Sequence, residues 1–164
     1  MLTEWLTHGK PTILGAISGC VAGLVAITPG SGFVGPMSSV IIGLVAGILC
    51  YFTVSVVKAR LGYDDALDAF GIHGIGGAWG AVATGLFASK AINAAGADGL
   101  FYGNPEQLLI QVKAALISIV FAAAATFIIM KAINLVTVIR ATAEEEIMGL
   151  DLPMHGERAY DHIF

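Results

Sequence analysis

Long stretches without charged residues dominate the chain. No Asp, Glu, Lys or Arg occurs from Pro11 to Val57, from Ala69 to Ser89 or from Ala114 to Met130, and the last stretch continues to Ile139 with only Lys131 interrupting it. A helix needs about 20 apolar residues to cross the hydrocarbon core of a bilayer. The first stretch is more than twice that length and predicts two spans joined by a turn. We therefore predict an all-α, polytopic membrane helical bundle with four transmembrane helices.

Residues that end helices set the expected boundaries. The turn between the first two spans is PGSGFVGP, the loop after the second is KARLGYDD, and a loop rich in glycine follows the third from Lys90 to Gln107. The transmembrane bundle at 11–139 is thus expected to contain spans at about 11–28, 37–57, 66–89 and 108–139. We interpret residues 1–10 as the end of a preceding helix followed by a cytoplasmic loop, and residues 140–164 as an acidic cytoplasmic tail.

The third predicted span carries the chemistry of interest. Asp64 or Asp65 is expected to cap its start, and Asp68 to lie in its first turn, where the helix dipole favours a carboxylate. Glycines crowd this span, which lets helix backbones approach closely in lipid and predicts an interior helix. They are Gly71, Gly74, Gly76, Gly77, Gly80 and Gly85.

His73 lies within this glycine-rich span. An ionisable residue inside a membrane span is rare and usually faces a cavity or the bundle interior, which favours a functional role. The alternative is a ring that bonds a backbone carbonyl for packing alone. A neutral imidazole can donate from one nitrogen and accept at the other, so it could handle a small polar solute. No cysteine, carboxylate or second histidine is spaced to complete a metal site, so no metal is expected.

Composition and charge agree with a membrane protein. Hydrophobic residues make up 57% of the chain and charged residues 12%, and the mean hydropathy is +0.84, which excludes an ordinary soluble domain. Net charge is −4, and the tail from Ala141 alone carries six acidic residues against Arg158, which is −5. The acidity is therefore local, and nucleic acid is not an expected partner. Basic residues favour a cytoplasmic tail, with Lys90 and Lys113 on the opposite side.

Sequence motifs of enzymes are missing. The run GIHGIGGAWG has Trp79 where a dinucleotide-binding motif needs its third glycine, and HExxH, GxSxG and a P-loop do not occur. No nucleophile or pair of carboxylates accompanies His73. We therefore expect neither an enzyme nor a cofactor.

The residues around His73 resemble a family signature. The run from Asp68 to Gly77, DAFGIHGIGG, resembles the D-x-F-G-x-H-G-x-x-G signature of the Amt ammonium transporters, in the Amt/Rh superfamily. The segment GKPT at 9–12, the first span and the tail from Gly149 resemble the same family. The resemblance covers essentially the whole chain and places it in the C-terminal portion of such a protein.

The resemblance implies a homotrimer of eleven-helix subunits for nitrogen uptake, each with a hydrophobic channel, of which this chain supplies the eighth to eleventh helices. His73 would be the second of two pore histidines. Asp68, Phe70, Gly74 and Gly77 would be structural residues near the pore. Ammonium or ammonia would be the substrate, and the plasma membrane the location, with the C-terminus cytoplasmic.

The remaining expectations concern the tail and the first half of the family's pore. The resemblance implies a regulatory tail and a PII-type regulator as a possible partner at the cytoplasmic face. The tail residues are Gly149, Asp151, His155, Gly156, Glu157 and Tyr160. The first pore histidine and the external ammonium site belong to family helices not found here, so we expect the chain to need its missing N-terminal half and to be inactive alone. The alternative is a truncated, non-conducting or ammonium-sensing regulatory membrane fragment.

Overall fold

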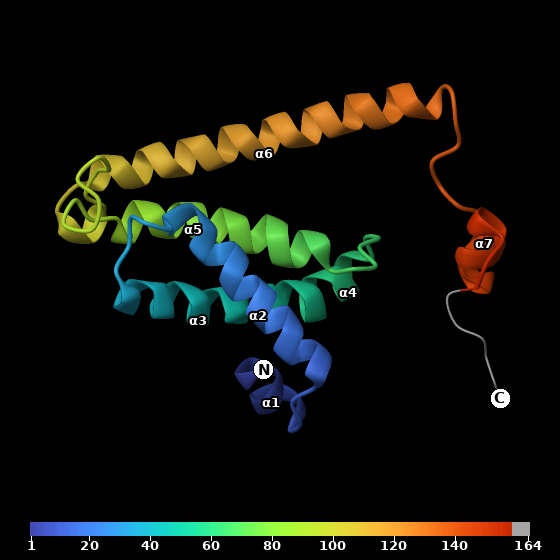
Figure 1. The fold of residues 1–164 in the computed structure, drawn as a ribbon, viewed down its shortest axis with the longest axis horizontal. Helices are drawn as coiled ribbons and strands as arrows, with labels where there is room; N and C mark the ends of the chain where they lie inside the picture. Colours follow the sequence, from blue (N-terminus) through green and yellow to red (C-terminus); the bar gives the residue numbers. More distant parts are fainter. Residues whose placement is uncertain (159–164) are drawn as a thin grey trace. The chain divides into compact units, whose positions relative to one another are not determined.

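The computed structural model describes residues 1–158, and all regular structure in that range is helical, which confirms the all-α prediction. The chain divides into two compact units, Met1–Ser118 and Ile119–Phe164 (Figure 1). The helices are α1 (Leu2–His8), α2 (Ile13–Ile27), α3 (Pro36–Phe52), α4 (Lys58–Leu61), α5 (Ile75–Phe87), α6 (Pro105–Asn134) and α7 (Ala143–Met148). Short 3₁₀ turns are η1 (Thr28–Gly30) and η4 (Leu100–Tyr102), and π-helical turns are η2 (Thr53–Val57), η3 (Phe70–Gly74) and η5 (Asp151–His155).

Three helical stretches within the described residues are long and apolar enough to cross a membrane: Ile13–Gly30, Pro36–Leu61 and Pro105–Asn134. The fourth expected span, at 66–89, forms η3 and α5 and is not among them. It starts only at Phe70 and ends at Phe87, and its glycines and histidine make it less apolar than the others. The last helix begins at Pro105 rather than 108, because proline suits the first turn of a helix.

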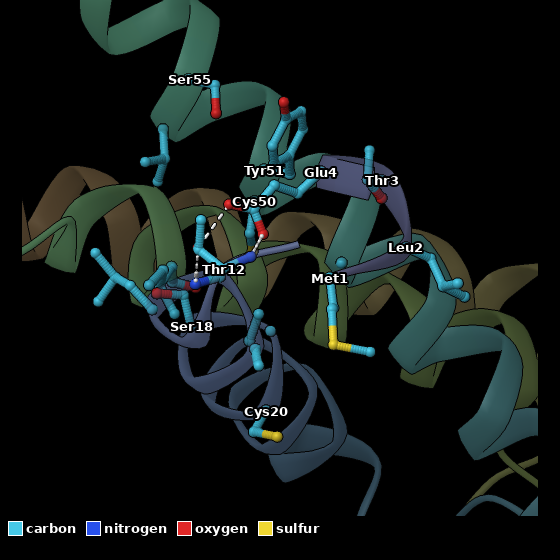
Figure 2. Close-up of a pocket in the computed structure, with 18 of the residues that line it drawn as sticks. Met1, Leu2, Thr3, Glu4, Thr12, Ser18, Cys20, Cys50, Tyr51 and Ser55 are labelled. Atoms are coloured by element: carbon cyan, nitrogen blue, oxygen red, sulfur yellow. Dashed lines mark hydrogen bonds between the residues drawn. The ribbon is translucent and has the colours of Figure 1, made fainter. Parts of the chain in front are cut away.

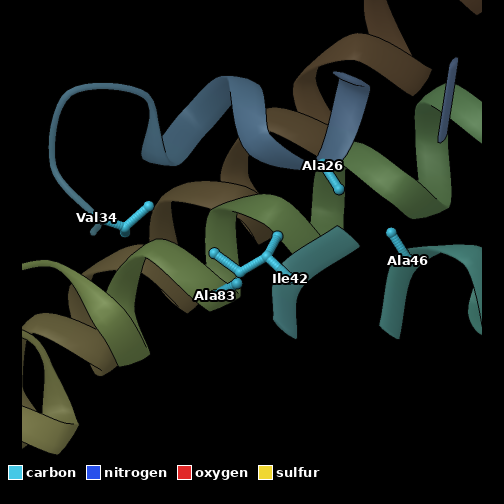
Figure 3. Close-up of a cluster of buried hydrophobic side chains, with 5 residues drawn as sticks. All are labelled: Ala26, Val34, Ile42, Ala46 and Ala83. Atoms are coloured by element: carbon cyan, nitrogen blue, oxygen red, sulfur yellow. The ribbon is translucent and has the colours of Figure 1, made fainter. Parts of the chain in front are cut away.

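Helices α2, α3 and α5 pack against one another in the first unit, and Figure 1 shows α2 crossing α3 and α5. A cluster of buried side chains lies where they meet (Figure 3). The cluster contains Ala26, Val34, Ile42, Ala46 and Ala83. Only Ile42 among these fully buried residues has a large side chain. The core is thus made by close approach of helix backbones, the packing mode that small residues allow in membranes.

Gly80 sets the closest approach between α2 and α5. A Cβ atom at this position would lie 2.2 Å from the carbonyl oxygen of Ala26 and 3.0 Å from Cδ of Pro29. Beside it, the indole N–H of Trp79 donates to the carbonyl oxygen of Ile42 at 3.0 Å and ties α5 to α3. The glycine-rich helix is therefore packed on two neighbours, as the glycine pattern predicts.

The connection between α1 and α2 is held by Glu4. Its carboxylate accepts hydrogen bonds from the Thr12 hydroxyl at 2.7 Å and from the Thr12 backbone N–H at 3.1 Å. These bonds lower the pKa of Glu4. The Thr12 hydroxyl in turn accepts from the N–H of Gly15 at 2.9 Å and caps α2. One carboxylate thereby fixes both the loop and the start of the next helix.

Candidate functional site

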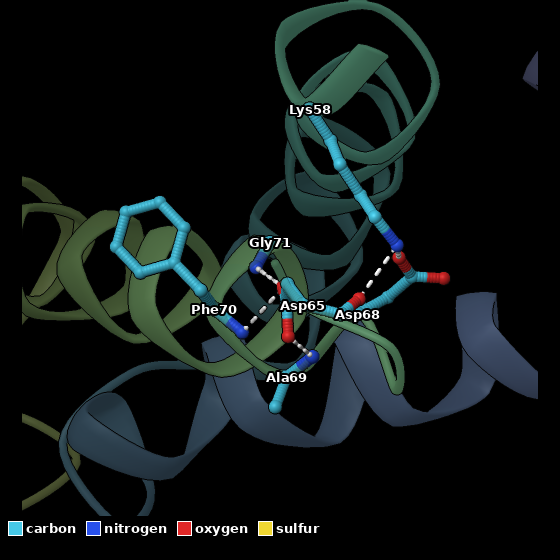
Figure 4. Close-up of polar contacts among 6 residues, drawn as sticks. All are labelled: Lys58, Asp65, Asp68, Ala69, Phe70 and Gly71. Carbon is cyan, nitrogen blue, oxygen red and sulfur yellow. Dashed lines mark hydrogen bonds and ion pairs between the residues drawn. The ribbon is translucent and has the colours of Figure 1, made fainter. Parts of the chain in front are cut away.

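The helix that carries His73 starts with a side-chain cap. The carboxylate of Asp65 accepts hydrogen bonds from the backbone N–H groups of Ala69 at 2.9 Å, Phe70 at 3.0 Å and Gly71 at 3.4 Å (Figure 4). The first N–H groups of a helix have no partner within the helix, so this carboxylate satisfies three of them. Of the two aspartates expected to cap this helix, Asp65 is the one that does so.

Asp68 does not lie in the first helical turn, and that expectation is wrong. It precedes η3 and has a positive φ of 56°, a left-handed conformation that few residues with a side chain adopt. The chain forms a turn here, in which the N–H of Asp68 donates to the carbonyl oxygen of Asp65 at 3.1 Å. The Asp68 carboxylate instead forms an ion pair with Lys58, with Nζ and Oδ1 2.6 Å apart.

His73 lies in the π-helical turn η3, which departs from regular α-helix. The N–H of Ile75 bonds the carbonyl of Phe70, five residues earlier, so this turn holds one residue more than an α-helical turn. Such turns occur often at functional sites. The extra residue sets the direction in which the histidine leaves the helix relative to α5.

The imidazole of His73 borders an open, almost wholly apolar groove of about 470 Å³. The other lining residues are Val21, Leu24, Val25, Thr28, Pro29 and Gly77. Within residues 1–158, His73 is exposed and its ring makes no hydrogen bond or ion pair. The packing alternative, in which the ring bonds a backbone carbonyl, is therefore not the arrangement seen in this part of the chain.

The other expected residues near the pore have different surroundings. The Phe70 side chain is 55% exposed, and the Tyr63 ring contacts it edge to face with centroids 5.6 Å apart. Gly74 faces that Phe70 ring, which a Cβ atom would approach to 3.0 Å. Gly77 lies in the groove with His73, where a Cβ atom would be 4.0 Å from Cγ1 of Val25. Gly77 alone of these shares the open space of the histidine.

A second cavity, of about 490 Å³, does not include His73 (Figure 2). It lies among α1, α2 and α3, and Glu4, Cys50, Tyr51 and Asp68 are among its lining residues. Asp68 and His73 therefore border different spaces. No group of His, Cys, Asp and Glu in the described part of the chain is arranged to hold a metal ion.

Lys58 is the residue of this region that sequence reasoning missed. The sequence placed it in a polar loop, yet its ammonium group contacts both the Asp68 carboxylate and the Asp65 carbonyl oxygen, each at 2.6 Å. The sequence feature that could have indicated this contact is the carboxylate of Asp68, which follows Lys58 by ten residues across a loop. No periodicity of a single helix links the two positions.

The second unit contains the expected tail residues. Thr142 and Glu145 form a capping box at the start of α7, and the donors on Thr142 lower the pKa of Glu145. Gly149 and Gly156 have positive φ angles of 85° and 70°, which explains glycine at both positions. Between them η5 runs from Asp151 to His155, and Glu157 is exposed. Tyr160 lies outside the described residues.

Comparisons with known proteins agree with this picture. The model of the Ammonium Transporter Family matches residues 1–160. An ammonium transporter of Bacillus subtilis is 56% identical over 160 residues, which are 98% of this chain and 40% of that relative. An ammonium transporter of Aquifex aeolicus is 50% identical over 98% of this chain and 37% of the relative. The chain thus spans about two fifths of the length of these relatives.

A solved structure shows the same fold. The crystal structure of Saccharomyces cerevisiae Mep2 superposes with a TM-score of 0.81 and 34% sequence identity, over 88% of this chain and 34% of that one. Candida albicans Mep2 gives a TM-score of 0.80 at the same identity. The chain therefore shares the fold of part of those larger proteins.

Proposed function

Because this chain belongs to the ammonium transporter family, we propose that it forms the His73 side of a pathway by which ammonia or ammonium crosses a membrane. The observation that carries the proposal is the His73 imidazole, which has no hydrogen-bond partner in residues 1–158 and borders an apolar groove. The family and the apolar helices make the chain part of a membrane transporter.

The groove has the chemistry that passage of ammonia needs. Its walls are mainly aliphatic, from Val21, Leu24 and Val25, so a solute within it would lose contact with water once the rest of the assembly covers the groove. Burying an unpaired charge costs far more than burying a neutral polar group, so such walls favour ammonia over ammonium. A neutral imidazole can supply both a donor and an acceptor to that solute along the way.

The larger assembly extends this proposal. We propose four membrane spans, with the helix from Phe70 to Phe87 crossing among the others, in a homotrimer whose subunits include the N-terminal half of the family. The acidic tail would lie on the cytoplasmic side of the plasma membrane, where a PII-type protein could bind it. The basic residues at the expected inner ends of the helices support this orientation.

One observation favours a second candidate. The groove is open, and the His73 ring is exposed in the described chain rather than enclosed on all sides. A chain with this groove uncovered would conduct nothing by itself. The second candidate is therefore a non-conducting or ammonium-sensing membrane component, in which the same histidine meets the solute without passing it on.

Uptake of radiolabelled methylammonium tests the proposal. Cells without their own ammonium transporters would express this chain together with the complementary segment of the Bacillus subtilis relative. We expect His73→Ala to lower uptake at least about tenfold, since the loss of one good hydrogen bond corresponds to about 1.4 kcal/mol. His8→Ala is the matched control, because His8 lies outside the groove and bonds Tyr51 instead.

The outcomes separate the two candidates. Equal uptake by His73→Ala and His8→Ala would refute the role of His73 in the pathway. The sensing component would be favoured if no co-expressed pair took up methylammonium, while the parent chain still bound it and His73→Ala did not. Uptake by the parent chain expressed alone would show that the open groove is sufficient.

A further inference from the structure

We propose that Lys58 is a positioning residue for His73, because its ammonium group holds the turn from which the histidine-bearing helix starts. This inference rests on the proposed function of His73. Lys58 touches no part of the groove, so its effect would pass through the backbone of residues 65–72.

The ammonium group of Lys58 joins two separate parts of the turn. Its Nζ atom is 2.6 Å from Oδ1 of Asp68 and 2.6 Å from the carbonyl oxygen of Asp65 (Figure 4). The paired side chains are 29% and 28% exposed, so water screens the ion pair less than on an open surface. Lys58 lies at the start of α4, directly after the π-helical turn η2, and thereby connects the end of the α3 segment to this turn.

The backbone at Asp68 explains why the turn needs an external contact. A left-handed conformation is unfavourable for a residue with a Cβ atom, although aspartate tolerates it better than most. The ion pair with Lys58 accompanies this conformation and offsets part of its cost. Asp68 therefore combines a strained backbone angle with a carboxylate bound to a neighbouring segment.

The turn is connected directly to the residue before His73. The carbonyl oxygen of Asp68 accepts from the N–H of Ile72 at 3.0 Å. On its other side, the carbonyl oxygen of Ile72 lies 3.7 Å from the thiol of Cys50 on α3, which donates to it. A rotation at Asp68 would move Ile72 and change the direction in which the next side chain points into the groove.

The capping carboxylate depends on the same lysine. Asp65 bonds three N–H groups of the helix start, and Lys58 bonds its backbone oxygen. Without the ammonium group, the carboxylates of Asp65 and Asp68 would lose the cation that bonds this turn at both positions. Their mutual repulsion would act directly on the geometry of the helix start.

Four variants of the co-expressed transporter test this role. Lys58→Met keeps the length of the side chain and removes its charge, whereas Lys58→Arg keeps the charge. Asp68→Asn keeps a side chain that tolerates positive φ and removes the ion pair. Arg60→Met is the control, because Arg60 is a neighbouring exposed cation that lines neither cavity.

Two measurements would be made on each variant. The first is methylammonium uptake, with its ratio to ammonium uptake. The second is the ¹⁵N spectrum of the His73 ring in purified protein, which reports ring environment and tautomer without requiring transport. A role confined to folding would lower the amount of protein and leave the spectrum and the uptake ratio of the folded fraction unchanged.

We expect Lys58→Met and Asp68→Asn to shift the His73 ring signals and to lower uptake about tenfold. A misplacement of about 1 Å can lower a rate about hundredfold, so a tenfold loss corresponds to a smaller displacement of the ring. Lys58→Arg should restore most of both, and Arg60→Met should stay within about twofold of the parent. If Lys58→Met does not fold, Asp68→Asn decides the result. Ring signals and uptake in Asp68→Asn equal to those of Arg60→Met would overturn the inference, while a loss of uptake in His73→Ala would leave the proposed function intact.

Discussion

Replacement of Gly80 by alanine adds one methyl group at the tightest contact between α2 and α5. The new Cβ atom would lie 2.2 Å from the carbonyl oxygen of Ala26, 3.0 Å from the carbonyl carbon and 3.0 Å from Cδ of Pro29. Ordinary contact begins at 3.4 Å, so the two helices must separate by about 1.2 Å, the difference between 3.4 and 2.2 Å. The opposing atoms belong to backbone and a proline ring and cannot rotate away.

The expected cost follows from this separation. Forcing extra volume into a packed core typically costs about 1–3 kcal/mol, and the rigid neighbours place Gly80→Ala at the upper end, about 3 kcal/mol. The higher helix propensity of alanine returns only about 1 kcal/mol. Because α2 supplies Val25 and the turn η1 directly after it supplies Pro29 to the groove, the movement would widen the space beside His73.

Unfolding of the purified protein in detergent, followed by helical circular dichroism, measures this effect. Gly23→Ala is the matched control, since a Cβ atom there meets nothing within 4 Å and Gly23 lies in α2, the helix that Gly80 contacts. We expect Gly80→Ala to be destabilised and Gly23→Ala to be at least as stable as the parent. Stabilities of the two variants within about 0.5 kcal/mol of each other would refute the close-approach argument.

Two further predictions concern single hydrogen bonds. Trp79→Phe removes the indole donor to the Ile42 carbonyl and should lower the free energy of unfolding by about 1 kcal/mol, measured in the same assay; an unchanged value would show that this bond contributes nothing. Thr142→Ala removes the hydroxyl that donates to Glu145, so the carboxyl pKa, followed by ¹³C titration, should rise part of the way to its ordinary 4.5, because the backbone donor remains. Since the folded pKa of Glu145 is lowered, the cap is present at neutral pH and lost as the pH falls below 4.5 and through that lowered pKa. An α7 amide exchange pattern that is the same above and below this range would contradict the assignment.

The sequence predicted the helical class because a chain with uncharged runs of this length can adopt few structures other than membrane-spanning helices. It located the turn at 29–36 and the loop after Ser89 from glycines and prolines. It predicted the fourth span by the same rule, yet glycines both promote close packing and lower hydropathy, so Phe70–Phe87 is less apolar than the other three helices. Proline at Pro105 explains the error at the start of α6.

The site was predictable only in its residue types. His73 was identified because an ionisable residue is unusual in an apolar run. Helical periodicity could not predict the ion pair of Asp68 with Lys58, since the pair depends on a left-handed residue in the loop between two helices. Patterns of period 3.6 describe one regular helix and contain no information on a π-helical turn, which adds a residue without changing composition.

Because that added residue is contained within one turn, the number of residues in the regular helix that follows decides where the imidazole points relative to the rest of α5. Removal of one residue from Phe70–Gly74 would return this turn to regular α-helix and leave the segments on either side nearly in phase, because the extra residue is contained within one turn. Removal of one residue from α5 after Gly77 would instead rotate everything before the cut by about 100°, because an α-helix has 3.6 residues per turn. A gene variant with a single codon lost here would keep every residue type that defines the groove. It would nevertheless turn His73 and Gly77 by that angle relative to the end of α5, so deletions there should be far less tolerated than substitutions.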